Sequence, residues 1–98
     1  MPSEPRVHIL KCWPESFRAV VAGTKRHEIR KDDRGYEVGD VLTLREYEPT
    51  GVPSIGMFTG SVARVRVTYK TPGGSWGLPA DLCVLSVEPC EEPKVVRP

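Results

Sequence analysis

Hydrophobic and polar residues alternate most regularly between residues 61 and 69. Four residues suited to a core share one side of the extended chain and three polar residues share the other: Ala63, Val65, Val67 and Tyr69 against Arg64, Arg66 and Thr68. A period of two residues is typical of a strand with one buried face. The segment therefore predicts a strand with an apolar inner face and a basic outer face.

A helical pattern occurs near the start of the chain. Phe17, Val20 and Val21 repeat at i, i+3 and i+4, which forms one apolar stripe. Pro14 suits the first helical position because its missing N–H would have no partner there. Gly23 predicts the end of the helix, since glycine adopts the left-handed conformation without a Cβ penalty.

Four further segments have strand character, because they are short, rich in apolar or β-branched residues and bounded by turn residues. They are Val7–Cys12, Lys25–Lys31, Val41–Tyr47 and Leu82–Val87. Within Lys25–Lys31, alternation places Arg26, Glu28 and Arg30 on one face and Lys25, His27 and Ile29 on the other. We expect the face that carries Ile29 to be directed at the core.

Five short strands and one early helix predict a mainly β domain with one or two short helices. We expect a closed or nearly closed small barrel with the helix at one end, and an open antiparallel sheet covered by the helix is the alternative. The segment Glu48–Gly56, which contains Pro49, Gly51 and Pro53, reads as a loop. The length allows one core, so we expect one domain over residues 1–88 and a flexible tail over residues 89–98.

The charge of the chain is unevenly distributed. The net charge is +1 overall, but residues 1–34 hold eight Lys and Arg against five Asp and Glu. An anionic partner would therefore meet the N-terminal third of the chain. A basic face that is merely solvated is the alternative, because most charge runs have no partner.

Cysteine and histidine usage indicates neither a disulfide framework nor a metal site. Cys12, Cys83 and Cys90 are odd in number and have no C-x-x-C spacing. His8 and His27 have no ligands at a metal-site spacing, so we expect structural histidines, no metal and no cofactor. The chain has no signal-like or membrane-spanning apolar run, so we expect a cytoplasmic protein without membrane contact.

The segment Gly23-x-Lys25-x-x-Glu28-x-Arg30, followed by Gly39-Asp40, resembles the ASCH domains of the PUA-like superfamily. Three further motifs, from His8 to Phe17, from Arg34 to Asp40 and from Phe58 to Gly60, are similar to those of a small bacterial and phage subfamily. The resemblance covers His8 to Val87. It implies a small PUA-like barrel with a cleft beside the Gly23–Arg30 strand.

For function, this resemblance implies binding of RNA or modified bases, and hydrolysis in some members. One branch removes the acetyl group from acetylated cytidine with a lysine, a threonine and a glutamate. The lysine of that branch falls on Lys25, but the position of its threonine is occupied by Glu28. The expected hydroxyl nucleophile is therefore missing, and Thr24 is the one nearby hydroxyl to consider.

The residues themselves also suit a nucleic-acid ligand. Glu28 and Arg30 lie on one strand face about 7 Å apart, so one can accept from an exocyclic amine while the other donates to a phosphate or a base edge. Lys25 adds a charge beside them. An ion pair without a ligand and an exposed lysine are the alternatives.

Three further candidates extend this surface. Lys11 and Trp13 offer a charge beside a stacking face, as in single-strand recognition, although a tryptophan next to a proline often packs on its own helix. Arg64 and Arg66 supply the basic outer face of their strand. We take these side chains as candidate nucleic-acid contacts.

The sequence thus predicts a nucleic-acid-binding module for RNA or a modified base, with DNA and a free nucleotide left open. The alternative is a small amidohydrolase-type enzyme acting on a modified nucleoside, with Lys25 as base or positioning cation and Glu28 or Thr24 assisting a water. A protein-interaction adaptor that uses a sheet edge is a third class. We assume a monomer.

Overall fold

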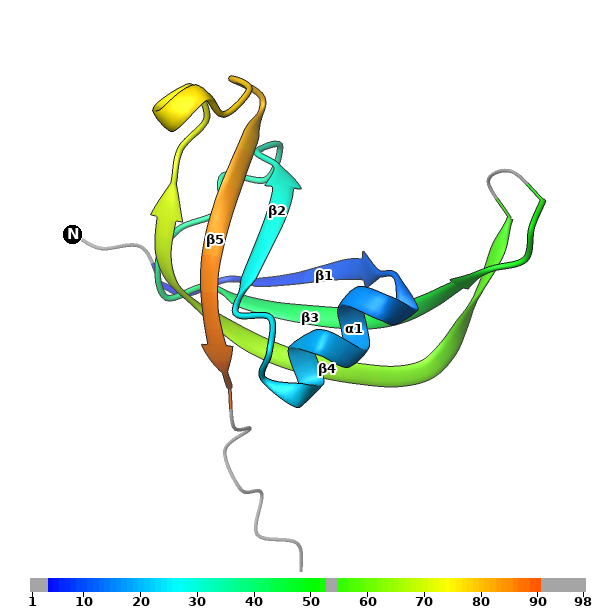
Figure 1. Ribbon diagram of the computed structural model, residues 1–98. Coiled ribbons are helices and arrows are strands. Elements are labelled where there is room, and N and C mark those ends of the chain that lie inside the picture. Colours follow the sequence, from blue (N-terminus) through cyan, green and yellow to red (C-terminus); the bar gives the residue numbers. More distant parts are fainter. Residues whose placement is uncertain (1–3, 53–54, 91–98) are drawn as a thin grey trace, which may run out of the picture.

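The first strand and the helix follow the sequence pattern in the computed structural model, which describes residues 4–52 and 55–90 (Figure 1). Strand β1 (Val7–Cys12) buries every second residue. Helix α1 (Pro14–Ala22) buries Phe17 and Val20 and is followed by Gly23 at φ 81°. The prediction that Gly23 ends the helix is confirmed. Glycine suits this position because the left-handed conformation strains a residue with a Cβ.

The remaining elements complete one mixed sheet. They are β2 (His27–Lys31), β3 (Val41–Pro49), β4 (Gly56–Thr71), the 3-10 turn η1 (Ser75–Gly77) and β5 (Leu82–Pro89). The strand order is β1-β3-β4-β5-β2, in which β1 and β3 are parallel and the other neighbours are antiparallel. Strands β1 and β2 are therefore the two edges.

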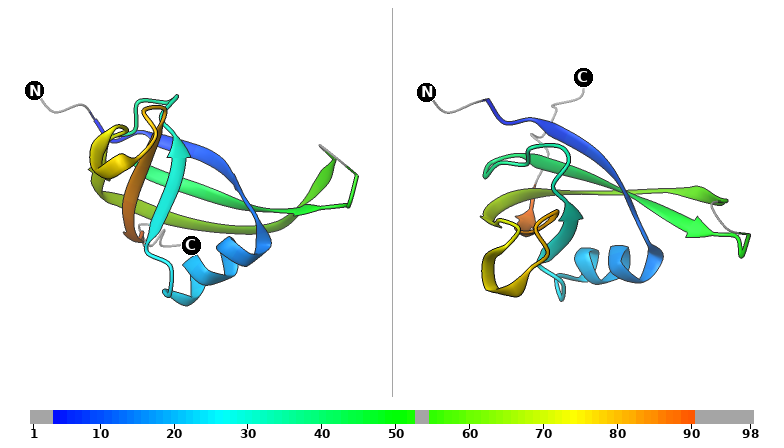
Figure 2. Two further views of the ribbon diagram at one scale, coloured as in Figure 1. Left: turned by 45° about the horizontal axis from the view of Figure 1, so that its top comes forward. Right: turned by 90° about the horizontal axis from the view of Figure 1, so that it is seen from above.

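The sheet curls because β4 is long enough to serve two partners. Its first part pairs with β3 and its last part pairs with β5, and the register shifts between Val67 and Tyr69. Such a bulge bends and twists a strand. Figure 2 shows the resulting half-barrel, with β1 and β2 on either side of its opening. The predicted mainly β fold with a short helix is confirmed.

The core fills the inside of this curl. Leu42 and Leu44 of β3, Val67 of β4, and Cys83 and Leu85 of β5 are almost fully buried. Phe17 and Val20 of α1 belong to the same cluster, so the helix covers the inner face at one end of the sheet. The ends of β3 and β4 extend past this core as a hairpin arm, residues 46–52 and 55–60 (Figure 1).

The second strand differs from its prediction in start and orientation. Strand β2 begins at His27 and not at Lys25, because the N–H groups of Thr24 and Lys25 still bond the helix carbonyl of Ala19. Glu28 is 2% exposed, whereas Ile29 is 55% exposed. The prediction that Ile29 faces the core was therefore wrong. Strand β2 is an edge strand, and the residue on its inner face is Glu28, whose carboxylate is paired with cations.

Two apolar stripes are also narrower than predicted. Tyr69 is exposed because the bulge after Val67 removes it from the inner face. Of the three residues in the predicted helix stripe, Phe17 and Val20 are buried in the core, whereas Val21 is exposed.

Parts of the predicted loop and of the predicted tail belong to strands. Of the predicted loop, Pro49 ends β3 and Gly56 begins β4, whereas Pro53 lies outside the described residues. Of the predicted tail, Pro89 ends β5 and the N–H of Cys90 donates to the Arg64 carbonyl. Residues 91–98 lie outside the described part of the chain.

Candidate functional site

Three side chains predicted to share a site meet beside Ser16, in the first turn of α1. The Nη2 atom of Arg30 lies 2.7 Å from Oε1 of Glu28, and Nζ of Lys25 lies 3.3 Å from its Oε2. Lys25 also donates a hydrogen bond to the Ser16 hydroxyl of α1. The side chain of Glu28 is only 3% exposed. We call Ser16, Lys25, Glu28 and Arg30 the Glu28 cluster; it neutralises a buried charge and leaves the carboxylate little access to a ligand.

Cys12 faces the same cluster from β1. Burial raises the pKa of its thiol, and the negative charge of Glu28 raises it further, while a hydrogen bond from Ser16 acts in the opposite direction. A thiol is nucleophilic as its thiolate. Cys12 is therefore a protonated core residue at neutral pH.

Two guanidinium groups cross the opening of the half-barrel. Arg30 donates to the carbonyl oxygen of Lys11 at 2.9 Å, and Arg34 donates to that of Ile9 at 3.2 Å. Residues 9 and 11 turn their backbone groups away from β3, because alternate residues of a strand face opposite neighbours. The arginines thus satisfy acceptors that an edge strand would leave to water.

Three adjoining hollows run along this edge of β1, and we call them together the β1 groove. The middle hollow, of about 430 Å³, is lined by Ile9, Leu10, Lys11, Arg30, Arg34, Arg45 and Phe58. The arm hollow, of about 480 Å³, is lined by Lys11, Trp13, Tyr47, Pro49, Gly51, Val52 and Ile55. The turn hollow, of about 330 Å³, is lined by Leu10, Ile29, Arg30, Lys31, Asp33, Arg34 and Tyr36. The arm and middle hollows share Lys11, and the middle and turn hollows share Leu10, Arg30 and Arg34.

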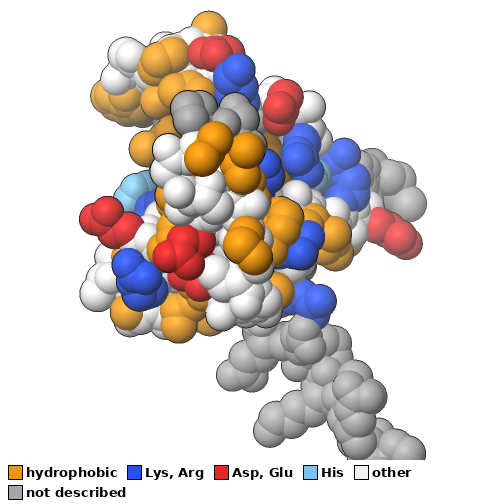
Figure 3. Space-filling view, turned by 90° about the vertical axis from the view of Figure 1, so that its right-hand side faces the viewer, with side chains coloured by type: hydrophobic (Ala, Val, Ile, Leu, Met, Phe, Trp, Pro, Cys, Tyr) orange, Lys and Arg blue, Asp and Glu red, His pale blue; other side chains and the backbone are white. Residues whose placement is uncertain are grey.

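The middle hollow is strongly basic. Four of its lining side chains are cationic, and no acidic residue lines it among those that the structure describes. Arg30 is paired with Glu28, but Lys11, Arg34 and Arg45 form no ion pair within residues 4–52 and 55–90. Figure 3 shows Lys and Arg side chains gathered on one half of the face that includes the hairpin arm. Such a concentration of positive charge attracts anions.

A row of aromatic rings borders these cations. The ring centroids of Trp13 and Tyr47 are 5.8 Å apart, and those of Tyr47 and Phe58 are 4.9 Å apart, both edge to face. Nζ of Lys11 lies 4.5 Å above the Tyr47 ring, and the Arg45 guanidinium lies 3.8 Å above the Phe58 ring. Both are cation–π contacts, which hold each cation beside a ring. Charge and stacking surface therefore lie side by side.

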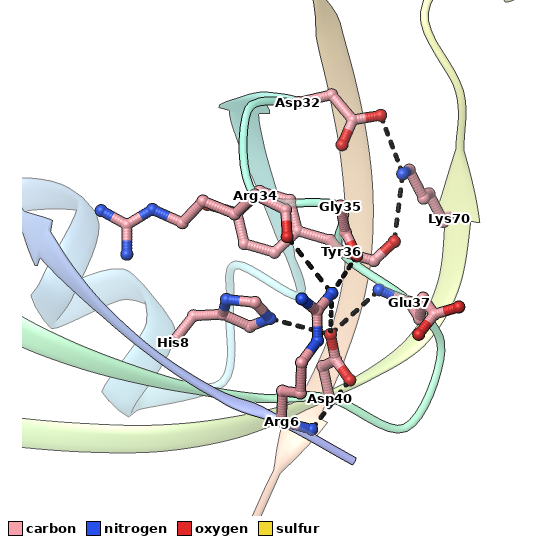
Figure 4. Close-up of polar contacts among 9 residues, drawn as sticks. All are labelled: Arg6, His8, Asp32, Arg34, Gly35, Tyr36, Glu37, Asp40 and Lys70. Carbon is pink, nitrogen blue, oxygen red and sulfur yellow. Dashed lines mark hydrogen bonds and ion pairs between the residues drawn. The ribbon is translucent and has the colours of Figure 1, made fainter. Parts of the chain in front are cut away.

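A second polar cluster, the Asp40 anchor, fixes the other end of β1 (Figure 4). Asp40 is 1% exposed. Its carboxylate lies 2.8 Å from Nε2 of His8 and accepts the backbone N–H groups of Arg6 and Glu37 at 3.1 Å each. His8 also packs against Tyr36 at 4.8 Å. These contacts hold the N-terminal end of β1 against the segment between β2 and β3, and so fix the position of the strand that forms the groove edge.

The environment of Asp40 sets its ionisation. Burial pushes its pKa upward, but the hydrogen bonds from His8 and from the N–H groups of Arg6 and Glu37 outweigh this, and the pKa ends below the ordinary value. The charged form is therefore favoured in the folded protein. This arrangement agrees with the structural role expected for His8, while His27 is exposed on β2.

The other predicted site residues lie away from the groove. Arg64 and Arg66 are on the outer face of β4 and line none of its three hollows, and Arg66 donates to the Cys90 sulfur at 3.3 Å. The Thr24 hydroxyl donates to the Ala19 carbonyl at 3.2 Å, where it caps the helix. The structure thus joins Lys11, Trp13 and Arg30 in one groove and puts Lys25 and Glu28 behind it.

Among the cationic and aromatic residues that line the arm and middle hollows, four were not predicted contacts: Arg34, Arg45, Tyr47 and Phe58. Alternation in the predicted strand Val41–Tyr47 already places Arg45 and Tyr47 on one face, and this signal could have found them. Arg34 follows two aspartates in a turn, and its position at β1 depends on tertiary contacts. Within the described ranges, no group of three potential metal ligands occurs, and no helix is long and apolar enough to cross a membrane.

Comparisons with known proteins identify relatives of this chain. The model of a family described as "Domain of unknown function (DUF3850)" matches residues 7–87. A protein of Escherichia phage P2, described as "Uncharacterized 12.9 kDa protein in GpA 3'region", is 38% identical over 71 residues. The matched region is 72% of this chain and 60% of the phage protein.

Proposed function

The chain belongs to this family of unknown function, and we propose from the geometry of its groove that it is a nucleic-acid-binding module, with RNA as the expected ligand. The observation that carries the proposal is the middle hollow, in which four cations meet Phe58 with no lining carboxylate in the described part of the chain. Nucleic acids carry phosphates and bases close together, so a matching surface needs both features.

The unpaired cations support binding of a phosphate backbone. Within the described residues, the Arg34 guanidinium bonds only the Ile9 carbonyl, which leaves further N–H donors for a ligand. Lys11 and Arg45 are each held against a ring, so their charges are positioned before any ligand arrives. The resemblance to ASCH domains adds support, since it implies RNA or modified-base binding.

The hydrolase alternative has weaker support. Thr24 is bound to the helix end, and both oxygens of Glu28 lie against cations in the Glu28 cluster. Neither group is presented to the β1 groove as a nucleophile or base. We also propose a reducing, cytoplasmic location, because Cys12 and Cys83 are buried free thiols.

The test is the affinity for fluorescently labelled single-stranded RNA, measured by anisotropy between about 50 and 200 mM salt. We expect binding that weakens as salt rises, because bound phosphates release counterions. Arg34→Glu should weaken binding about tenfold and lower the salt dependence by roughly one counterion.

The matched control is Arg18→Glu, which makes the same charge change on an exposed residue of α1 outside the groove. It should bind within about twofold of the wild type, because it contacts no phosphate in the proposed complex. Equal losses in the two variants would mean that only net charge matters, and absence of binding to RNA and DNA at about 50 mM salt would refute the proposal. Turnover of acetylated cytidine by the same protein would favour the hydrolase alternative.

A further inference from the structure

We propose that the arm hollow holds one unpaired base of a single-stranded nucleic acid, stacked on Trp13 with its edge towards Tyr47, while the adjoining phosphates lie at Lys11, Arg34 and Arg45. This inference rests on the proposed function and names the form of nucleic acid that the groove selects. It separates single strands from duplexes, which the proposed function alone does not.

The arm hollow differs in chemistry from the middle hollow beside it. Its walls are Trp13, Tyr47 and apolar residues of the hairpin arm, and Lys11 is the one cation among the described residues that line it. Trp13 is 57% exposed, and Val52 and Ile55 are 53% and 55% exposed. Exposed apolar side chains that converge on one hollow indicate a ligand surface, because water is a poor partner for all of them.

The two hollows meet at a single side chain. Lys11 lines both, with its ammonium group above the Tyr47 ring. A nucleotide has the same division, with a flat apolar base at one end and an anionic phosphate at the other. The placement of Lys11 between the aromatic wall and the guanidinium groups matches that division.

The aromatic wall can be used only by a base that has left a double helix. In a duplex each base is stacked on both faces and offers its edge alone in the grooves. Stacking on a side chain requires a free base face, which single strands provide. The groove edge, six residues of β1, is roughly 16 Å long at about 3.3 Å per residue, so it accommodates up to about five stacked nucleotides.

Close packing in the hairpin arm holds Tyr47 in this wall. A Cβ added to Gly56 would lie 2.5 Å from Cε2 of Tyr47 and 2.7 Å from the Glu48 carbonyl oxygen. The ring therefore occupies space that only a glycine leaves open. Tyr47 also contacts Trp13 and Phe58 on either side, so its position does not depend on a bound ligand.

The experiment compares variants of two exposed tryptophans. Trp13 lines the arm hollow, whereas Trp76 is 97% exposed on η1, at the opposite end of the molecule from the hairpin arm (Figure 1). The probes are a five-nucleotide single-stranded RNA with 2-aminopurine at its centre, the same RNA in a duplex, and the mononucleotide. Affinity is measured by titration, and 2-aminopurine fluorescence reports stacking of the base.

We expect Trp13→Ala to weaken binding of the single strand about tenfold and to abolish the quenching of 2-aminopurine. Trp13→Phe should restore most of both, and Trp76→Ala should change neither. The duplex and the mononucleotide should each bind at least about tenfold more weakly than the single strand. Circular dichroism of each variant verifies that it is folded, and Trp13→Leu, which keeps an apolar side chain but has no ring to stack on, serves as the test if Trp13→Ala is not.

Several results would overturn this inference while the proposed function stands. They are unchanged affinity in Trp13→Ala with a loss in Arg34→Glu, equal affinity for the duplex, equal affinity for the mononucleotide, and failure of Trp13→Phe to restore stacking. If no probe binds the wild type at all, the proposed function and the inference both fail.

Discussion

The Asp40 anchor and the β1 groove lie along the same strand, yet they treat charge in opposite ways. Asp40 is buried, and its two oxygens are met by His8 and by two backbone N–H groups. In the groove, Lys11, Arg34 and Arg45 are open to solvent or half-buried and have no carboxylate partner among the described residues. The carboxylate of Asp40 has hydrogen-bond partners on both oxygens, whereas the groove carries positive charge that no described carboxylate neutralises.

This difference separates structure from binding. A buried charge with all its partners stabilises one conformation, and its removal leaves buried hydrogen-bond donors without an acceptor. Exposed cations without partners contribute little to stability, since surface charges are screened by water. Groove substitutions should therefore alter binding more than folding, and anchor substitutions should do the reverse.

The largest effect is expected for Asp40→Ala. It removes the acceptor of His8 and of two backbone N–H groups, so the free energy of unfolding should fall by about 3 kcal/mol. Urea denaturation measures this change. Glu37→Ala is the control, because Glu37 contributes its backbone N–H while its side chain is exposed; a loss as large as that of Asp40→Ala would show that the anchor is not centred on Asp40.

Glu28→Gln tests how the buried Glu28 cluster affects the β1 groove, because Arg30 belongs to both. The change keeps the shape but removes the charge that Arg30 and Lys25 share, so the free energy of unfolding should fall by about 2 kcal/mol. Arg30 also loses its neutralising partner, so RNA affinity and its salt dependence should both rise. Glu15→Gln on the exposed side of α1 is the control, and a drop in RNA affinity with Glu28→Gln would place Glu28 itself in contact with the ligand.

The pH dependence of stability should follow Asp40. Its folded pKa is below the ordinary value of 3.8, so its contribution to stability is complete above that pH and is lost as the pH falls through the lower, folded value. The free energy of unfolding, measured from pH 7 down to pH 3, should fall more steeply below pH 3.8 in the wild type than in Asp40→Asn. Parallel curves would contradict this role of Asp40.

The smallest effect on folding is expected for Arg34→Ala. The exposed side chain makes one hydrogen bond, to Ile9, so the free energy of unfolding should change by no more than about 0.5 kcal/mol. Thermal or urea denaturation beside the RNA titration would compare the two effects directly. A stability loss of several kcal/mol would mean that Arg34 is part of the structural scaffold and not only of the binding surface.

Periodicity and turn chemistry determined much of the fold from the sequence alone. The strand Val7–Cys12, the helix from Pro14 with its end at Gly23, and the inner residues Val65 and Val67 of β4 follow from local patterns. These properties are local because a strand or helix repeats its own geometry whatever it packs against. The pairing of Glu28 with Arg30 was predictable for the same reason.

Tertiary structure decided which of these polar residues face a ligand. The core side of β2 received Glu28 and not Ile29, because Lys25 and Arg30 neutralise the carboxylate from separate positions. Arg34 and Arg45 joined Lys11 only when β1, β3 and the turn after β2 came together. The sequence by itself determined the strands, the helix and a basic N-terminal third, whereas the groove depends on contacts between residues far apart in the chain, which no local period encodes.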